Sequence, residues 1–266
     1  MQKPSPAHRL LTLAALLAAL PAAAAPNKIT EIEDNGSYAT AINGNGSIVV
    51  GGLVTQAAVW SGTNWAKKTI LGTLKTDDEL LAGTYLQPSA SGVSGDGSVV
   101  VGHTIDDNRK IHAIVWYGNN WEKKIDLGTH RNDNSGEAEA RAVSRDGKII
   151  TGYADNKDFD DRATVWSGSN WATKTDLGTL ATGNSGVSYA NAISSNGSVV
   201  VGTSTDDSDR YRAVTWSGNG WSTITDLGTL NDGNIGRSFG YGISGDGSVV
   251  VGKSLRYGYE ERAVAW

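Results

Sequence analysis

The sequence predicts an all-β protein, a five-bladed β-propeller built of four-stranded antiparallel blades. Three observations carry this prediction. Tryptophans recur in pairs five residues apart, at 60/65, 116/121, 166/171 and 216/221, and Trp266 stands alone. A second landmark, "GDGSVVVG" at 245–252, occurs in five versions, and a third, "DLGTL" at 226–230, occurs in four. A repeat of about 50 residues is typical of propeller blades.

Each repeat predicts four short strands. In residues 184–229, "SYANAIS" alternates small and apolar residues and then meets "SNG", a hairpin signal. The β-branched run "SVVVG" indicates a strand covered on both faces, and "RAVTW" and "WSTITDLG" follow around the turn "SGNG". Connections this short allow only an antiparallel meander, with the "DG" turns and the tryptophan hairpins on one face of the propeller.

The blades are expected at about 36–73, 85–129, 134–179, 184–229 and 234–266. The last blade lacks a fourth strand, whereas residues 28–34, "KITEIED", precede the first blade and match a fourth strand through "TEI" and "TDL". We therefore expect this N-terminal segment to pair with the C-terminal blade and to close the ring, which leaves no free sheet edge.

The N-terminus predicts export. Basic residues precede "LLTLAALLAAL", and "PAAAAP" offers a cleavage site, so residues 1–25 are interpreted as a signal peptide, with a buried helix as the alternative. The mature chain, 26–266, has no second long apolar run and is expected to be one extracellular or cell-surface domain, with the periplasm as an alternative. The net charge of the full chain, −5, and the lack of a basic patch argue against nucleic acid as a partner. Without cysteine, the domain must depend on its core rather than on disulfides.

Opposite charges recur at matching positions of the third and fourth strands. The pairs are Arg162 with Asp176, Arg212 with Asp226, His112 with Asp126 and, through the N-terminal segment, Arg262 with Glu31. The first blade carries Gln56 and Ile70 and so loses both charges together. This joint loss favours cross-strand ion pairs over independently solvated charges.

The tryptophans are predicted to pack across the third hairpin, one on each strand, and between blades; sugar stacking is the alternative. The combined motif, including "RAVTWSGNGWSTITDLGTL" at 212–230, resembles the HAF-type extracellular repeat of bacterial secreted and surface proteins. The resemblance covers nearly all of 28–266. It implies an extracellular setting and adhesion and supplies no ligand. Such repeats often form the exported passenger of autotransporters, so a purely structural passenger segment is an alternative function.

Binding on a repeated scaffold is expected in loops that vary between repeats. The loops between second and third strands are acidic and could gather a cation, a cationic ligand or a sugar, with a solvated loop as the alternative. The ligand-binding candidates are Asp106, Asp107, Asp158, Asp206, Asp207, Arg256, Tyr257 and Tyr259. The expected partner is a glycan or a host or surface protein. The protein is expected to be a monomer and to need no cofactor.

A zinc site and a glycosidase site are the alternatives to this binding function. His103, His112 and His130 fall at strand ends of the second blade and offer a zinc site, against three unrelated surface substitutions. A glycosidase-like enzyme needs a carboxylate pair near the axis, and only the third blade offers inner-strand acids, Glu137 and Glu139. No nucleophile elbow or phosphate loop occurs. A binding or adhesion module is therefore the predicted function, with the enzyme as an alternative.

Overall fold

The computed structural model of the 266-residue chain describes residues 31–33, 36–75, 87–231, 233, 235–256 and 260–266. The chain divides into two compact units, Met1–Glu31 and Ile32–Trp266. The expected signal peptide, 1–25, and residues 28–30 of the expected closing strand lie outside the described residues. None of the helices in the described part of the chain has the length and apolar character needed to cross a membrane.

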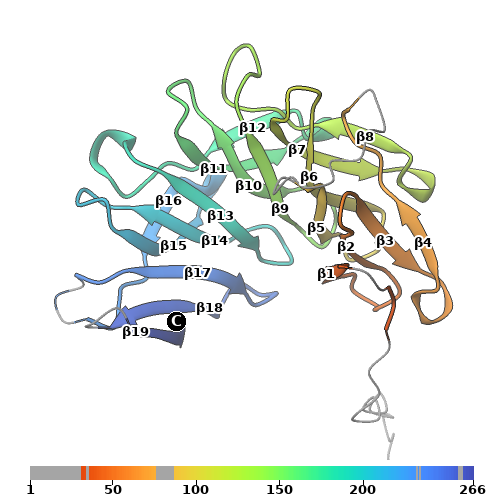
Figure 1. Ribbon diagram of the computed structural model, residues 1–266. Helices are drawn as coiled ribbons and strands as arrows, with labels where there is room; N and C mark the ends of the chain where they lie inside the picture. Colours follow the sequence, from red (N-terminus) through yellow and green to blue (C-terminus); the bar gives the residue numbers. More distant parts are fainter. Residues whose placement is uncertain (1–30, 34–35, 76–86, 232, 234, 257–259) are drawn as a thin grey trace, which may run out of the picture. The chain divides into compact units, whose positions relative to one another are not determined.

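The unit Ile32–Trp266 is built from antiparallel sheets (Figure 1). The first two sheets consist of β1 (Tyr38–Ile42), β2 (Val49–Gly52), β3 (Ala57–Ser61) and β4 (Lys67–Ile70), and of β5 (Ser89–Val93), β6 (Val99–Ile105), β7 (Ile111–Tyr117) and β8 (Lys123–Asp126). The next two consist of β9 (Ala138–Val143), β10 (Ile150–Asp155), β11 (Asp161–Ser167) and β12 (Thr173–Asp176), and of β13 (Ser188–Ile193), β14 (Val200–Thr205), β15 (Tyr211–Ser217) and β16 (Thr223–Asp226). The fifth holds β17 (Ser238–Ile243), β18 (Val250–Arg256) and β19 (Glu260–Ala265).

Every sheet pairs its strands in chain order, as a meander requires, and successive sheets contact each other through their first strands (Figure 1). The prediction of an all-β, five-bladed propeller is confirmed. In the described residues four blades have four strands and the fifth has three. Each blade is one supersecondary unit that buries its faces only against its neighbours.

The first strand of each blade contains a β-bulge, one residue that has no partner in the register with the second strand. In the fourth blade Ala190 pairs with Gly202 and Ala192 with Val201, so Asn191 is left out of the register. The bulge residues of the five blades are Thr40, Ser91, Arg141, Asn191 and Tyr241. A bulge bends its strand and redirects a side chain.

The bulge also explains why each "VVVG" motif ends in glycine. A Cβ on Gly202 would collide with the carbonyl oxygen of Tyr189, and Gly252 meets Phe239 in the same way. Backbone approaches this close leave room only for glycine. The most regular landmark of the sequence is therefore a packing requirement of the bulge.

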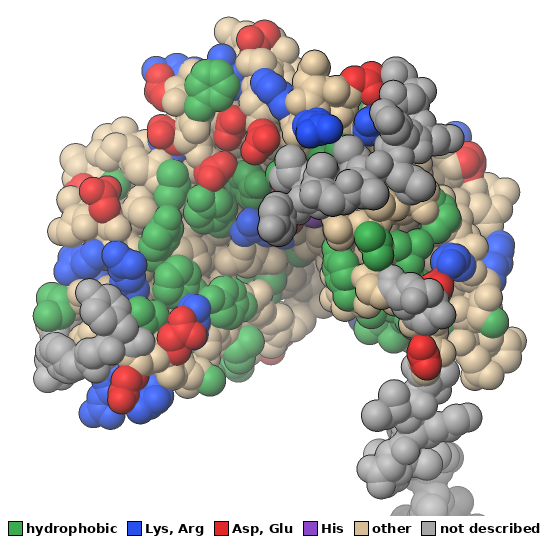
Figure 2. Space-filling model, viewed as in Figure 1, with side chains coloured by type: hydrophobic (Ala, Val, Ile, Leu, Met, Phe, Trp, Pro, Cys, Tyr) green, Lys and Arg blue, Asp and Glu red, His purple; other side chains and the backbone are tan. Residues whose placement is uncertain are grey.

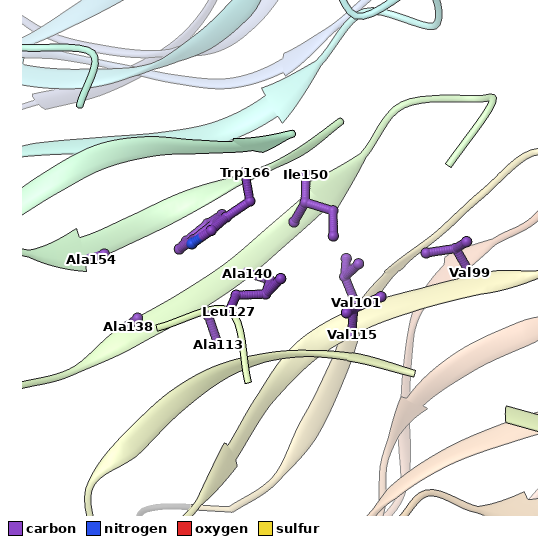
Figure 3. Close-up of a cluster of buried hydrophobic side chains, with 10 residues drawn as sticks. All are labelled: Val99, Val101, Ala113, Val115, Leu127, Ala138, Ala140, Ile150, Ala154 and Trp166. Atoms are coloured by element: carbon purple, nitrogen blue, oxygen red, sulfur yellow. The ribbon is translucent and has the colours of Figure 1, made fainter. Parts of the chain in front are cut away.

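Hydrophobic clusters lie between consecutive blades (Figure 3). One of them joins Val101 and Val115 of the second blade to Ile150 and Trp166 of the third. These four side chains are fully buried. The continuous β-branched runs of the sequence predicted such strands, which are covered on both faces.

The two tryptophans of a pair play different structural roles. The first is at most 1% exposed in all four pairs (Trp60, Trp116, Trp166 and Trp216), which confirms its structural role and excludes sugar stacking for it. The second tryptophan was predicted to lie on the fourth strand. It lies instead in a single 3₁₀ turn before that strand. In η3 (Ser169–Trp171) the backbone φ of Trp171 is +53°, and its indole Nε1 donates to the Gly147 carbonyl, 3.0 Å away. This bond places the tryptophan hairpin and the "DG" turn on the same face, as predicted.

Backbone hydrogen bonds join the "DG" turns of neighbouring blades. The amide of Gly44 donates to the carbonyl of Gly95 (3.0 Å), Gly95 to Arg145 (2.8 Å), Arg145 to Ser195 (3.1 Å) and Ser195 to Gly245 (2.9 Å). Within each turn the acid or amide accepts hydrogen bonds from its neighbours, as Asp96 does from the Ser94 hydroxyl at 2.7 Å. These acids and amides therefore stabilise their turns, and the backbone bonds between the turns hold the blades in sequence.

Of the N-terminal segment predicted to close the ring, only Ile32 and Glu33 are described within the unit that holds the blades. Ile32 packs against Trp60 of the first blade, and Glu33 forms an ion pair with Lys68 of β4 (2.7 Å) and accepts a hydrogen bond from the Trp60 indole (3.4 Å). Arg262 pairs with Glu260 at 2.6 Å. In the described residues β19 pairs only with β18. The end of the fourth strand of the first blade contacts the next blade in the same way, since the Trp116 indole donates to the Gly72 carbonyl at 2.8 Å, so pairing of residues 28–31 with β19 stays a prediction.

Candidate functional site

Three bulge residues meet in one pocket. Arg141 of β9, Asn191 of β13 and Tyr241 of β17 occupy equivalent positions in successive blades, and each side chain reaches the pocket lining. The pocket has a volume of about 280 Å³ and is lined by Arg141, Tyr189, Asn191, Thr203, Tyr211, Phe239 and Tyr241, which we call the aromatic pocket. Figure 2 shows hydrophobic side chains gathered over the inner strands of these blades, with acidic side chains beside them.

Arg141 is held rigidly at the wall of the pocket. Its Nε and Nη2 donate to Glu139 (3.3 and 3.2 Å), and its Nη1 donates to Asn191 Oδ1 (2.7 Å). Its guanidinium carbon lies 4.9 Å from the ring centroid of Tyr153 and 5.3 Å from that of Tyr189. The planar guanidinium is thus fixed both by hydrogen bonds in its plane and by stacking on its faces.

Asn191 connects the third, fourth and fifth blades. Its Oδ1 accepts from Arg141, and its Nδ2 donates to the carbonyl of Gly240 at 2.7 Å. The equivalent bulge residue of the first blade behaves alike, since the Thr40 hydroxyl donates to the carbonyl of Ala90 at 2.5 Å. The bulge residues therefore join one blade to the next as well as line the pocket.

Tyr189 is fixed by an acid from the neighbouring blade. Its hydroxyl donates to Asp161 at 2.7 Å, and its ring meets that of Tyr153 edge to face at 5.4 Å. Burial, together with the hydrogen bond to the Asp161 carboxylate, raises the pKa of Tyr189 far above its ordinary value. The phenol is neutral under all physiological conditions and acts as a fixed donor.

A row of three rings forms the opposite side of the pocket. Tyr211 and Phe239 have centroids 5.6 Å apart and planes inclined by 30°, and Phe239 and Tyr241 follow at 6.4 Å and 20°. Lys253 Nζ lies 5.1 Å from the Phe239 centroid and pairs with Glu261 at 2.6 Å. Tyr241 is 50% exposed, so the row is accessible from solvent.

The acidic loop candidates divide between structural and exposed positions. Asp106 and Asp206 each accept two backbone amides of their own loop, and Asp206 also pairs with Arg210 at 3.0 Å. Burial opposes ionisation of Asp106, but hydrogen bonds from the Lys110 and Asn108 amides outweigh it and lower the pKa. Both acids therefore shape their loops, as capping residues of turns do.

The other loop candidates do not converge on one site. Asp207 accepts the amide (2.5 Å) and hydroxyl (2.9 Å) of Thr182 in the connection from the third blade, which is a structural contact. Asp107 and Asp158 are exposed, and Asp158 pairs with Lys157 at 3.0 Å. Arg256 is exposed at the end of β18, and Tyr257 and Tyr259 lie outside the described residues.

The three histidines form no common metal site. His103 contacts Glu139 (3.6 Å), His112 contacts Asp126 (3.0 Å) and Asp106 (3.4 Å), and His130 meets the Thr164 hydroxyl (2.9 Å). The described residues contain no group of three or more metal-ligating side chains that could hold an ion. The zinc prediction is wrong because the separate strands direct each ring to a different partner.

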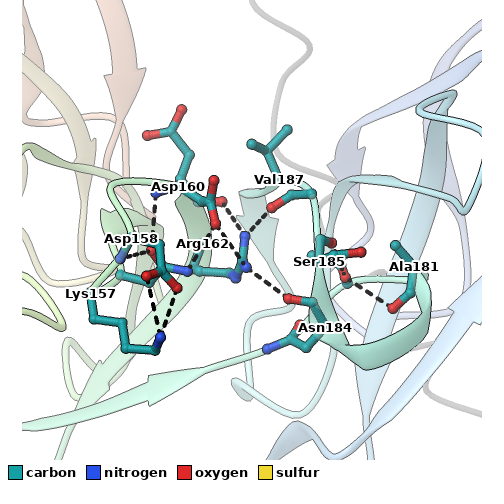
Figure 4. A network of polar contacts seen from close by, with 12 residues as sticks. Lys157, Asp158, Asp160, Arg162, Ala181, Asn184, Ser185 and Val187 are labelled. Carbon is teal, nitrogen blue, oxygen red and sulfur yellow. Dashed lines mark hydrogen bonds and ion pairs between the residues drawn. The ribbon is translucent and has the colours of Figure 1, made fainter.

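The predicted ion pairs inside the blades are confirmed, but their arginines are buried. Arg212 is 2% exposed and binds Asp226 at 2.7 Å, and Arg162 approaches Asp176 at 3.8 Å. Arg162 also donates to the carbonyls of Asn184 and Gly186 and pairs with Asp160 (Figure 4). Arg162 therefore ties its blade to the connection that follows it, and both buried guanidiniums exclude the solvated alternative.

Three acids of the third blade, Asp155, Glu139 and Asp161, make structural contacts. Asp155 is 7% exposed, and its Oδ2 accepts the amide of Glu137 at 2.9 Å. Burial, with the nearby charges of Asp161 and Glu137, raises the pKa of Asp155. Glu139 binds Arg141, and Asp161 binds Tyr189. These carboxylates support the pocket wall.

Sequence reasoning missed the aromatic pocket, although a signal for it exists. The inner strands keep their small residues at alternate positions, yet the bulge position differs in every blade. The inner strands also vary two residues before the bulge, and variation on a constant scaffold is where binding usually resides. The bulge itself could not be predicted from the sequence, because the register of two strands is known only once they are paired.

No family model and no curated protein matches the chain. Among solved structures, the putative TolB from Agrobacterium tumefaciens is similar with a TM-score of 0.58 and 13% identity, over 86% of this chain and 76% of that one. TolB from Acinetobacter baumannii is similar with a TM-score of 0.53 and 10% identity, over 84% of this chain and 53% of that one. Likeness at this level of identity shows a shared propeller fold and nothing further.

Proposed function

We propose that the protein is an exported binding protein, similar to the HAF-type extracellular repeat proteins, that holds its ligand in the aromatic pocket. The observation that carries the proposal is the convergence of three bulge residues, Arg141, Asn191 and Tyr241, from three blades on one accessible cavity. A cavity with aromatic walls and a few fixed polar groups is the usual form of a binding site.

Binding without chemistry fits the carboxylates better than hydrolysis does. A glycosidase needs one carboxyl group ready to donate a proton and a second ready to attack or to activate water. Here Glu139 is neutralised by Arg141, Asp161 accepts the Tyr189 hydroxyl, and Asp155 accepts a backbone amide. All three acids come from one blade, so the geometry supports recognition by the pocket.

The acidic loops have a supporting role in this proposal. Asp106, Asp206 and Asp207 fix loop conformations and blade connections through the contacts given above. Adhesion would then depend on the inner-strand pocket more than on the loops that the sequence favoured. The partner is a glycan or a surface protein that presents a group small enough to enter the pocket.

The test uses the mature chain on arrays of glycans and of peptides, beside two tyrosine variants. Tyr241→Ala removes a half-exposed ring of the pocket, and Tyr38→Ala removes a ring of similar exposure (44%) from β1, outside the pocket. We expect at least one array ligand to be retained by the wild type and by Tyr38→Ala and to be lost by Tyr241→Ala. Retention that is equal in all three proteins, or cleavage of the array ligand, would overturn the proposal.

Export is proposed from residues 1–25 alone. The basic start, the apolar run and the small residues that follow form the pattern of a cleaved signal. Deletion of residues 2–25 should therefore leave the protein in the cytoplasm of a bacterial host, whereas the full chain should be recovered outside it and start near Ala25 or Pro26. Full-chain protein that stays cytoplasmic and uncleaved would contradict export.

A further inference from the structure

We infer that the aromatic pocket takes one neutral pyranose ring, as a free sugar or at the end of a glycan; this inference rests on the proposed binding function. The volume is the first argument. Pockets for drug-sized ligands measure about 300–1,000 Å³, and the aromatic pocket, at about 280 Å³, lies just below that range. A single six-membered ring with its hydroxyl groups fits such a space, whereas a longer oligomer must leave it.

The ring row supplies a surface for the apolar face of a sugar. Tyr211, Phe239 and Tyr241 follow one another with planes inclined by 30° and 20°, and Tyr241, at the end of the row, is 50% exposed and offers its ring to a ligand. The face of an aromatic ring carries negative charge density, and the axial C–H groups of a pyranose are weakly positive. When the C–H face of a pyranose stacks on an aromatic ring, apolar surface is removed from water and the hydroxyl groups stay unburied.

The opposite wall supplies fixed hydrogen-bonding groups for the hydroxyls. A guanidinium has five N–H donors, and within the described part of the chain Arg141 donates three of them to Glu139 and Asn191. Two donors therefore remain, in an orientation fixed by those bonds and by the flanking tyrosines. The amide of Asn191 keeps one further N–H, because Gly240 takes the other.

The charges select a neutral ligand. Each cation at the pocket already has a carboxylate, Arg141 with Glu139 at 3.2 Å and Lys253 with Glu261 at 2.6 Å. A cationic ligand would compete for ring faces that Arg141 and Lys253 already occupy. An anionic ligand would meet Glu139 and would find no unpaired cation. A polyhydroxylated neutral ring avoids both costs.

The experiment measures binding of methyl glycosides of glucose, galactose and mannose by saturation-transfer NMR and titration, with glucuronate and glucosamine as the charged counterparts. We expect at least one neutral glycoside to bind with a dissociation constant in the millimolar range, as suits so small a ligand, and both charged sugars to bind at least fivefold more weakly. Tyr241→Ala should lower the affinity about tenfold, and Tyr38→Ala should leave it unchanged. An oligosaccharide that ends in the same sugar should bind no more weakly than the free glycoside.

The outcomes separate the inference from the proposed function. A charged sugar that binds as tightly as the neutral one, or sugar binding that survives Tyr241→Ala, overturns the inference. If no sugar binds but a peptide from the arrays does so in a Tyr241-dependent manner, the ligand class is wrong and the binding function stands. If neither sugars nor peptides bind in a Tyr241-dependent manner, the sugar inference and the proposed binding function are both wrong. Phe239→Tyr keeps a ring at the centre of the row and should keep the affinity, which guards against a folding defect in the alanine variant.

Discussion

The fourth and fifth blades contain the same strand sequence, "VVVG", in different surroundings. Val201 of β14 is fully buried, and its counterpart Val251 of β18 is 49% exposed. The fourth blade lies between the third and the fifth, and Gly240 of β17 packs directly against Val201. In the described residues no further sheet covers the outer face of the fifth blade. Local sequence therefore sets the strand, and the neighbouring blade sets its burial.

The ion pairs differ in the same manner. The Arg212 side chain is 2% exposed and binds Asp226 of β16, whereas Arg262 is 52% exposed and binds Glu260 two residues away on its own strand. The fifth blade lacks a described fourth strand that could supply the acid. In a structure where each repeat contacts only its neighbours, an end blade contributes less to stability than an interior one.

The largest effect is expected at the buried tryptophan. Trp216 is fully buried in the fourth blade, and Trp266 of the fifth is only partly buried. Trp216→Ala should lower the free energy of unfolding by about 3–5 kcal/mol, as large aromatic truncations in cores do, and Trp266→Ala by less than half as much. Urea unfolding followed by circular dichroism measures both. Equal losses would show that the two blades are equally covered in solution.

A smaller effect is expected from the valines. Val201→Ala removes two buried methyl groups and should lower the free energy of unfolding by about 2 kcal/mol. Val251→Ala removes methyl groups that are half in water and should change it by about 0.5 kcal/mol or less. The same denaturant titration applies to both. A loss at Val251 as large as that at Val201 would mean that another surface covers the fifth blade.

Coupling within the ion pairs comes next. In a double-mutant cycle, Arg212→Ala and Asp226→Ala should be non-additive by about 1 kcal/mol, because the arginine is buried and the hydrogen bond is short. Arg262→Ala and Glu260→Ala should be nearly additive, since both side chains are more than half exposed. Additive losses at Arg212 and Asp226 would remove the predicted cross-strand pair as a source of stability.

The smallest effect concerns pH and sets the second blade against the fourth. His112 takes the place of the arginine, and its hydrogen bond to Asp126 raises its pKa above the ordinary 6.5, although burial opposes this. A raised folded-state pKa stabilises the fold below pH 6.5, and that contribution is lost as the pH rises through the raised value. The melting temperature of the wild type minus that of His112→Gln should therefore be larger at pH 5.5 than at pH 8.5.

The matched control is Arg212→Gln, because arginine keeps its charge over this range. The difference in melting temperature between the wild type and Arg212→Gln should hardly change between pH 5.5 and pH 8.5. A His112→Gln difference that is flat or that grows toward pH 8.5 would show that the histidine is not charged in its contact with Asp126.

The repeat predicted the blades, the turns and the meander because these depend on contacts within about 50 residues of chain. The landmark glycine of "VVVG" was visible in the sequence, but its cause, the opposing bulge carbonyl, was not. The contacts of Ile32 and Glu33 with the first blade agree with the match of "TEI" to "TDL", because the end of another fourth strand, at Gly72, also contacts the tryptophan of the next blade. The pocket was missed because its residues come from three blades and meet only after the blades are packed side by side.

The bulge gives the protein one position per repeat at which a side chain can change without disturbing strand pairing. These positions, 40, 91, 141, 191 and 241, already carry threonine, serine, arginine, asparagine and tyrosine. Recombination that exchanges whole repeats would reorder these five side chains while leaving each blade intact. The architecture thereby allows specificity to change at the bulge while the strand pairing of each blade is kept.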